Sequence, residues 1–159
     1  MKFFDDIPIG HRIELGRHTF TPGDIKGFAA RFDAQPFHLD EDAAARSHFG
    51  RLCASGWHTA SVWMRHFVRY GDRVRREAEQ AGIPAPHFGP SPGFEALKWL
   101  KPVYAGDTIA FALTFLDKRD SRSRPGWGLV TMLAEGTNDA GDTVISFKAQ
   151  VFVEKREAP

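Results

Sequence analysis

Asp33 and His38 are the two side chains whose types and spacing best suit acid–base chemistry. They stand at the two ends of the segment 33–38, DAQPFH. A carboxylate and an imidazole held together can share one water molecule, with one group accepting a proton and the other donating one. Asp33 is the candidate base and His38 the candidate proton donor, although the roles can be exchanged because coupled groups titrate as a unit. Without further context, Asp33 could equally end a helix and His38 could be a buried polar side chain.

A short helix is expected to carry the aspartate. Thr21 followed by Pro22 is typical of an N-cap and a first helical residue, and apolar residues then recur at helical spacing. Pro36 removes an amide hydrogen and disfavours the helical conformation at the preceding residue, so the segment should leave the helix as an irregular turn. Asp40 or a neighbour is expected to cap a second short helix that runs through Arg46.

A longer helix is expected from about Trp57 to Tyr70, with a charged continuation. Its apolar residues cover more than one face, which predicts a core helix enclosed by other structure. Ser55 suits the N-cap position, although its hydroxyl could also bind a substrate. Gly56 would place an unpaired amide at the positive end of the helix dipole, where a substrate oxygen that gains negative charge could be stabilised.

Strands account for most of the remaining chain. Alternating or β-rich segments predict strands near residues 11–20, 94–100, 108–116, 128–136 and 143–153. The proline-rich segment 82–93 predicts the longest loop, and residues 138–142 predict a hairpin turn. One strand, a buried helix and a run of antiparallel strands indicate an α+β fold, an antiparallel sheet wrapped around a central helix, as a single domain over 1–159.

Composition excludes several classes of function. The chain has 159 residues and a net charge of +1, with 21 basic and 20 acidic side chains, so no nucleic-acid or anionic-membrane partner is indicated. The single cysteine, Cys53, and the start MKFFDDIPIG suggest a cytoplasmic protein without a disulfide. Cys53 has no base beside it in the sequence and is not taken as a nucleophile. The seven histidines show no metal-ligand spacing, and no metal or cofactor is expected.

Three segments resemble one family. Residues 28–40, 54–60 and 101–108 are similar to the signature, the entry to the central helix and a strand-connecting loop of MaoC-like acyl dehydratases and (R)-specific enoyl-CoA hydratases. The resemblance spans nearly the whole chain. It implies a hotdog fold paired into a homodimer or a dimer of dimers. It also implies hydration of a trans-2-enoyl thioester of coenzyme A, or the reverse dehydration.

Carried onto this chain, the resemblance implies that Asp33, His38 and Gly56 are catalytic. Residues expected to bind substrate are Ser55, Gln35, Phe37 and Trp57. Gln35 stands where the family more often has asparagine, and Ser55 stands where a histidine is frequent. Neither departure removes a catalytic group.

Two other functions fit the same fold. Hotdog proteins include thioesterases, in which a carboxylate directs water at the thioester carbon, and a non-catalytic hotdog subunit could simply bind acyl-CoA. Hydrolysis can proceed with one carboxylate, whereas hydration uses both partners. The presence of both Asp33 and His38 therefore favours the hydratase.

Overall fold

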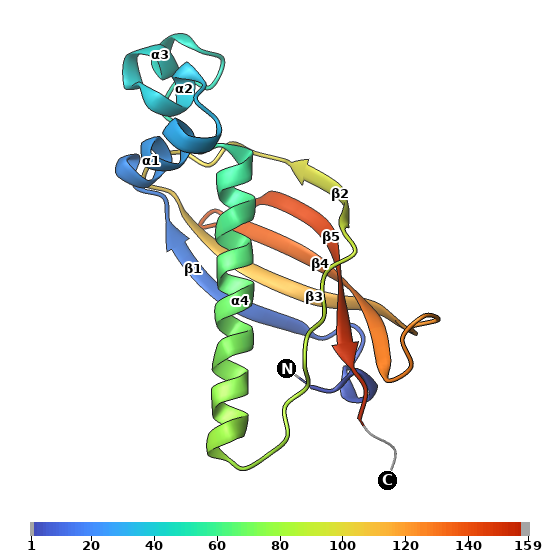
Figure 1. Cartoon of the computed structure of the whole chain (residues 1–159). Coiled ribbons are helices and arrows are strands. Elements are labelled where there is room, and N and C mark those ends of the chain that lie inside the picture. The colour runs from blue at the N-terminus through green and yellow to red at the C-terminus, as the bar shows by residue number, and fades with distance from the viewer. Residues whose placement is uncertain (1, 157–159) are drawn as a thin grey trace.

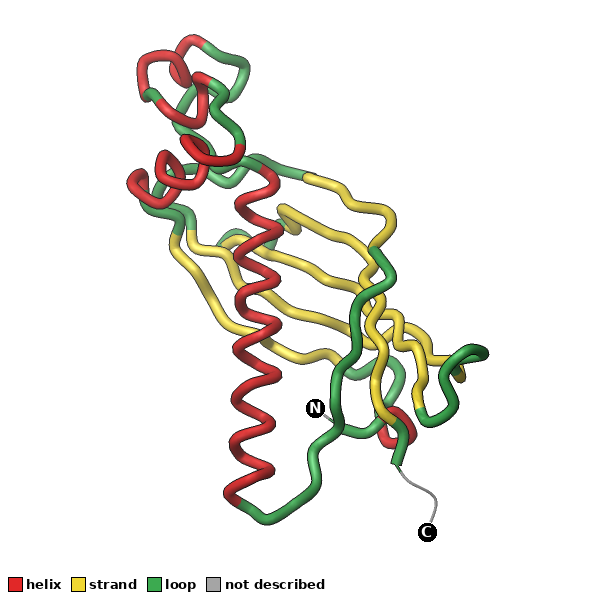
Figure 2. The backbone as a smooth tube through the Cα atoms, in the orientation of Figure 1, coloured by secondary structure: helices red, strands yellow, loops and turns green. Residues whose placement is uncertain are grey.

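The computed structural model describes residues 2–156 as an antiparallel sheet crossed by one long helix (Figures 1 and 2). The strand order is β1-β3-β4-β5-β2, and every neighbouring pair is antiparallel. The strands are β1 (Arg12–Thr19), β2 (Phe94–Trp99), β3 (Thr108–Asp120), β4 (Trp127–Asn138) and β5 (Thr143–Glu154). The helices are η1 (Phe4–Asp6), α1 (Pro22–Phe32), α2 (Pro36–Leu39), α3 (Glu41–Arg46) and α4 (Gly56–Gln80). The expected α+β architecture is confirmed.

The core lies between α4 and the sheet. Trp63 is fully buried, and its indole Nε1 donates a hydrogen bond to the Ala112 carbonyl at 2.9 Å. The inward-facing side chains of β3, including Phe111 and Leu113, are also fully buried. Burying large apolar side chains of this kind contributes roughly 1.5–3 kcal/mol each, so this contact fixes the position of α4 on the sheet.

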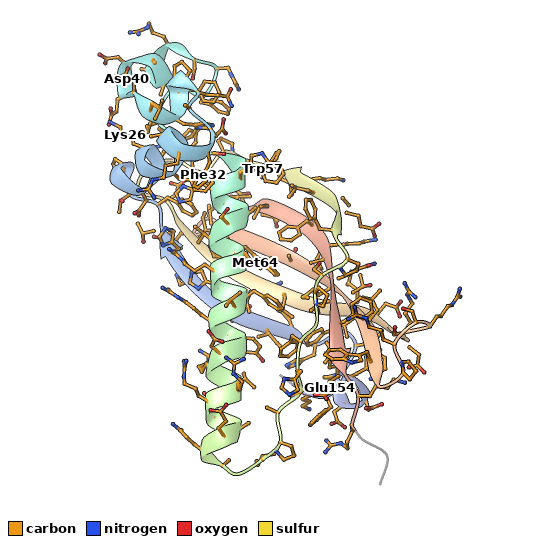
Figure 3. All side chains as sticks on the ribbon, viewed as in Figure 1. Lys26, Phe32, Asp40, Trp57, Met64 and Glu154 are labelled. Carbon is orange, nitrogen blue, oxygen red and sulfur yellow. The ribbon has the colours of Figure 1, made fainter. Side chains whose placement is uncertain are left out.

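Within residues 2–156, one face of α4 is covered and the opposite face is exposed. Trp57, Met64 and Val68 are 50%, 47% and 52% exposed, and Figure 3 shows the first two along the helix that crosses the sheet. The expectation that this helix is enclosed by other structure is therefore wrong for a single chain. The sheet packs against one side of α4, and no described element packs over the exposed side.

Three short helices gather beside the N-terminal end of α4 (Figure 1). The Thr21 side chain accepts a hydrogen bond from the Asp24 amide and caps α1, and Asp40 caps α3 in the same way. Both capping predictions are confirmed. Pro36, however, begins the helix α2 rather than an irregular turn. The amide hydrogen of the first helical residue has no acceptor within the helix, so its absence in proline costs nothing there. The fixed φ angle of proline is also a helical one.

The predicted strands are all present, but some run further than the hydrophobic alternation does. Lys118 on β3 still pairs with Val130 on β4, so backbone pairing continues past Phe115, the last buried residue of β3. The proline-rich loop and the hairpin turn lie where they were expected. Among the described residues, no helix combines the length and the hydrophobicity needed to cross a membrane.

Candidate active site

Asp33 and His38 meet beside the start of α4. Asp33 is the C-cap residue of α1, and His38 belongs to the single turn of α2 that follows. The Asp33 Oδ2 atom lies 3.6 Å from His38 Nε2, and the His38 ring is buried. Because α2 turns the chain back directly after Pro36, the two side chains named by the motif are brought together.

The His38 ring is held by a backbone carbonyl. Its Nδ1 atom lies 2.7 Å from the Cys53 carbonyl oxygen. Since a carbonyl can only accept, Nδ1 carries a proton and donates it, which leaves Nε2 directed toward Asp33. Cys53 itself pairs with Tyr104 in an isolated bridge. Burial raises the pKa of the Cys53 thiol to about 11, so the thiol is protonated and unreactive at neutral pH.

The Asp33 carboxylate is stabilised in its charged form. Burial alone would raise the pKa of Asp33, but polar interactions with Ser55 and Gln35 and the nearby His38 outweigh it, and the pKa is lowered. The Gln35 side chain donates from Nε2 to Asp33 Oδ1 at 2.8 Å. Asp33 is therefore ionised at neutral pH and can accept a proton.

A cavity of about 400 Å³ opens over this pair. Its wall combines the polar groups of the motif with aromatic and aliphatic side chains. Lys101 also lines it, and its Nζ atom forms an ion pair with Asp142 at 2.8 Å. The lining residues are Asp33, Gln35, Phe37, His38, Phe49, Cys53, Ala54, Gly56, Trp57, Thr59, Trp99, Leu100, Lys101, Pro102, Val103 and Val144. Six of the seven site residues expected from the sequence thus share one cavity.

Ser55 is the seventh, and the structure places it behind the wall. It is buried, its Oγ accepts a hydrogen bond from the Trp57 amide at 3.1 Å, and it caps α4 as expected. Its hydroxyl also lowers the pKa of Asp33. A direct contact between Ser55 and a substrate stays a prediction.

Gly56 is the first residue of α4, and the Trp99 ring lies against its Cα atom, where a side chain would begin. No backbone acceptor for the Gly56 amide is found within residues 2–156, as is usual for a first helical turn. A Cβ atom added at Gly56 would lie 2.4 Å from Cε2 of Trp99. Glycine is therefore required here for close packing against an indole ring, in addition to any role toward substrate.

Trp99 is a site residue that the sequence reasoning missed. It ends β2, and its ring packs edge-to-face on Trp57 with centroids 5.2 Å apart. A register shift between Glu95 and Lys98, with Ala96 at a φ of 54°, precedes it. Bulges of this kind redirect the side chains that follow them. The sequence offered one indication that Trp99 could belong to the site, because Trp99 lies just before segment 101–108, which resembles the family's strand-connecting loop.

Comparison with known proteins identifies the family. A model described as the MaoC like domain matches residues 7–135, so the chain belongs to the MaoC-like domain family. A mesaconyl-CoA hydratase of Cereibacter sphaeroides is 34% identical over 157 residues. The match covers 98% of this chain but 42% of that relative, so this chain is less than half its length.

Solved structures agree on the fold. A MaoC-like dehydratase from Rhodospirillum rubrum superposes with a TM-score of 0.81 at 36% identity, over 99% of this chain and 100% of that one. The R-hydratase PhaJ1 from Pseudomonas aeruginosa gives a TM-score of 0.67 at 24% identity, over 99% and 93% of the two chains. The fold is the hotdog fold that the sequence motifs implied.

His58 follows Trp57 on α4 but does not line the cavity. Its ring stacks on Phe28 of α1 with centroids 4.6 Å apart and meets Phe20 edge-on. Its Nδ1 atom is buried and has no hydrogen-bond partner among the described residues. Burial, reinforced by His18 and Arg65 and opposed by Asp24, lowers the pKa of His58 to about 4.

Replacing His58 with phenylalanine should make the protein more resistant to acid. The folded protein binds this proton only near pH 4, whereas the unfolded chain binds it near 6.5, so stability is lost as the pH falls between those values. By pH 5 the loss from this residue is about 2 kcal/mol. Urea unfolding at pH 7 and pH 5 should therefore show a smaller decrease for His58→Phe than for the natural chain. Exposed His87→Gln is the control, and equal pH dependence in all three proteins would contradict the account.

Proposed function

We propose that this protein is an acyl-CoA hydratase/dehydratase that adds water to a 2-enoyl thioester or removes it from a 3-hydroxyacyl thioester. The observation that carries the proposal is the Asp33–His38 pair, 3.6 Å apart at the wall of a cavity that Gly56 also lines. The hydratases among the relatives support the reaction type by their names. The proposed activity is that of this chain, which is shorter than the mesaconyl-CoA hydratase.

The pair is suited to bind and divide one water molecule. Two acceptor or donor atoms 3.6 Å apart leave room for a water within hydrogen-bond distance of both. In hydration, His38 starts with a proton on both ring nitrogens, because Nδ1 keeps its proton on the Cys53 carbonyl. Asp33 accepts a proton from the water as the water oxygen bonds to C3, and Nε2 of His38 delivers its proton to C2. Net transfer of a proton from Asp33 to His38 then restores the starting state. Dehydration follows the same steps in reverse.

The electrons displaced from the double bond move toward the thioester oxygen. Negative charge on that oxygen requires a donor placed where the charge appears. The Gly56 amide at the positive end of α4 is the proposed donor, because it has no backbone acceptor within the described residues and Gly56 lines the same cavity. The alternative reaction is hydrolysis, in which the carboxylate directs water at the thioester carbon. That reaction needs no proton from His38 Nε2, so the presence of the pair favours hydration.

The substrate range can be measured with a panel of enoyl-CoA thioesters. Straight chains of increasing length should be compared with branched and dicarboxylic acyl groups, because Lys101 lines the cavity. Its Nζ atom pairs with Asp142 at 2.8 Å, so a substrate carboxylate would have to replace that partner. Hydration is followed by loss of the absorbance of the conjugated thioester. Turnover of at least one member supports the proposal, and no turnover across the panel in either direction would count against it.

We propose further that the protein is a homodimer. Edge strand β2 and the uncovered side of α4 expose an apolar surface that a second copy would cover. Its members are Trp57, Met64, Val68, Phe94, Trp99 and Leu100.

Light scattering at micromolar concentration should give about twice the chain mass of 17.8 kDa, or a multiple of that dimer. Val68→Asp should weaken the assembly, because it places a charge within the apolar surface. Glu79→Lys, on an exposed position of the same helix, should leave the mass unchanged. A monomer mass for the natural chain would overturn the proposed dimer.

A further inference from the structure

Gln35 connects to both members of the acid–base pair. Its Nε2 donates to Asp33 Oδ1 at 2.8 Å, and its backbone amide donates to the Asp33 carbonyl at 2.7 Å. Its own carbonyl accepts the His38 amide at 2.9 Å. One residue therefore holds the aspartate by side chain and backbone and the histidine by backbone.

Pro36 makes this connection rigid. The residue before a proline is restricted to extended backbone conformations, and Gln35 has φ −78° and ψ 140°. The Gln35 backbone N–H donates to the Asp33 carbonyl and its carbonyl accepts from the His38 N–H, so the backbone is held on both sides. The Gln35 side-chain amide then lies against the Asp33 carboxylate. The turn between α1 and α2 is thus built around Gln35.

The bond divides the carboxylate into two unequal oxygens. Oδ1 is occupied by the Gln35 amide, whereas Oδ2 is the atom that lies 3.6 Å from His38 Nε2. Rotation of the carboxylate would break the Gln35 bond, so Oδ2 stays directed at the shared water. A hydrogen bond donated to a carboxylate also favours the ionised form, which is the form that accepts a proton.

We propose that Gln35 is a positioning residue, which holds Asp33 by Oδ1 and presents Oδ2 as the proton-accepting atom next to His38. The inference rests on the proposed hydratase activity and revises the expectation that Gln35 binds substrate.

The test compares three variants at Gln35. Gln35→Ala removes the donor, and Gln35→Glu keeps the shape but replaces the donor with a second negative charge. Both should lower kcat by about 10- to 100-fold, the usual effect of losing a hydrogen bond to a charged group. Both should also move the acidic limb of the kcat/KM profile upward by about one to two pH units, Gln35→Glu further than Gln35→Ala. Gln35→Asn keeps a donor and should retain more activity than either.

Gln80→Ala at the exposed end of α4 is the matched control and should change neither quantity. A rise in KM with kcat and the acidic limb unchanged would mean that Gln35 contacts substrate and would overturn the proposal. The Asp33 carboxyl titration, followed by carbon NMR in the natural chain, in Gln35→Asn and in Gln35→Ala, gives a readout without turnover. If no enoyl-CoA is hydrated but the Asp33 pKa rises in Gln35→Ala, where the donor is lost without a new charge, the positioning role stands and the proposed reaction fails. An unchanged Asp33 pKa in folded Gln35→Ala would overturn the positioning role itself.

Discussion

Asp33→Asn should lower kcat for hydration by about 10²- to 10⁴-fold while the protein stays folded. Asparagine has the shape of aspartate but cannot accept the proton of the attacking water. Asp33 lies at the end of α1 and does not belong to the hydrophobic core, so the protein should stay folded. The unfolding midpoint at neutral pH should fall somewhat, because the lowered pKa of Asp33 means that its charge stabilises the folded state. Asp40→Asn is the matched control, because asparagine can still cap α3. That variant should keep the turnover of the natural chain.

His38→Ala should cause a loss of the same order, since Nε2 is the partner of Asp33 in the proposed reaction. The double variant should be little worse than either single one, because the two residues act as a unit. Added imidazole should restore part of the activity of His38→Ala if the ring supplies a proton. Near-normal turnover in either single variant, on a substrate that the natural chain hydrates, would remove the pair from the mechanism.

Gly56→Ala should lower kcat by about 10²- to 10³-fold, the usual effect of losing one preorganised oxyanion donor. A methyl group here obstructs the approach of the thioester oxygen to the amide. On sequence grounds alone the stability should hold or rise, because alanine is the better helix former. The structure corrects this expectation, since the new Cβ would lie 2.4 Å from the Trp99 ring and either the ring or the helix must move.

Introducing Gly56→Ala into the Trp99→Ala variant separates the loss of the oxyanion donor from the clash with the Trp99 ring. In Trp99→Ala the obstructing ring is absent, so Gly56→Ala should be accommodated there with little further loss of stability. Thermal unfolding and steady-state kinetics of the single and double variants measure both quantities. A further large loss of kcat in the double variant would support the oxyanion role. A folded double variant with the kcat of Trp99→Ala would show that Gly56 is needed for packing and would exclude it from the mechanism.

The local signals of the sequence were reliable where a residue acts on its near neighbours. Thr21, Asp40 and Ser55 cap the helices that they were expected to cap. Pro36 shows the limit of this reasoning, because the same missing amide that ends one helix also suits the first residue of the next. The motif spacing identified Asp33 and His38 correctly as neighbours, since one tight turn joins them.

Features that depend on distant segments could not be predicted. The Cys53 carbonyl that orients His38 is set by the bridge to Tyr104, and Trp99 reaches Gly56 only because β2 is distorted before it. The helix α4 was expected to be enclosed because its apolar residues exceed one face. The spacing of apolar residues along a helix shows that a face is apolar. It does not show whether the same chain or a second chain covers that face.

The most direct measurement is the identity of the product that the natural chain forms from an enoyl-CoA. Mass spectrometry of the reaction mixture, with a thiol reagent in a parallel sample, distinguishes water added across the double bond from cleavage of the thioester. The proposed mechanism predicts a 3-hydroxyacyl-CoA heavier than the substrate by one water, no release of free coenzyme A, and loss of the product in Asp33→Asn and His38→Ala. Release of free coenzyme A without the hydrated thioester would contradict it and identify a thioesterase.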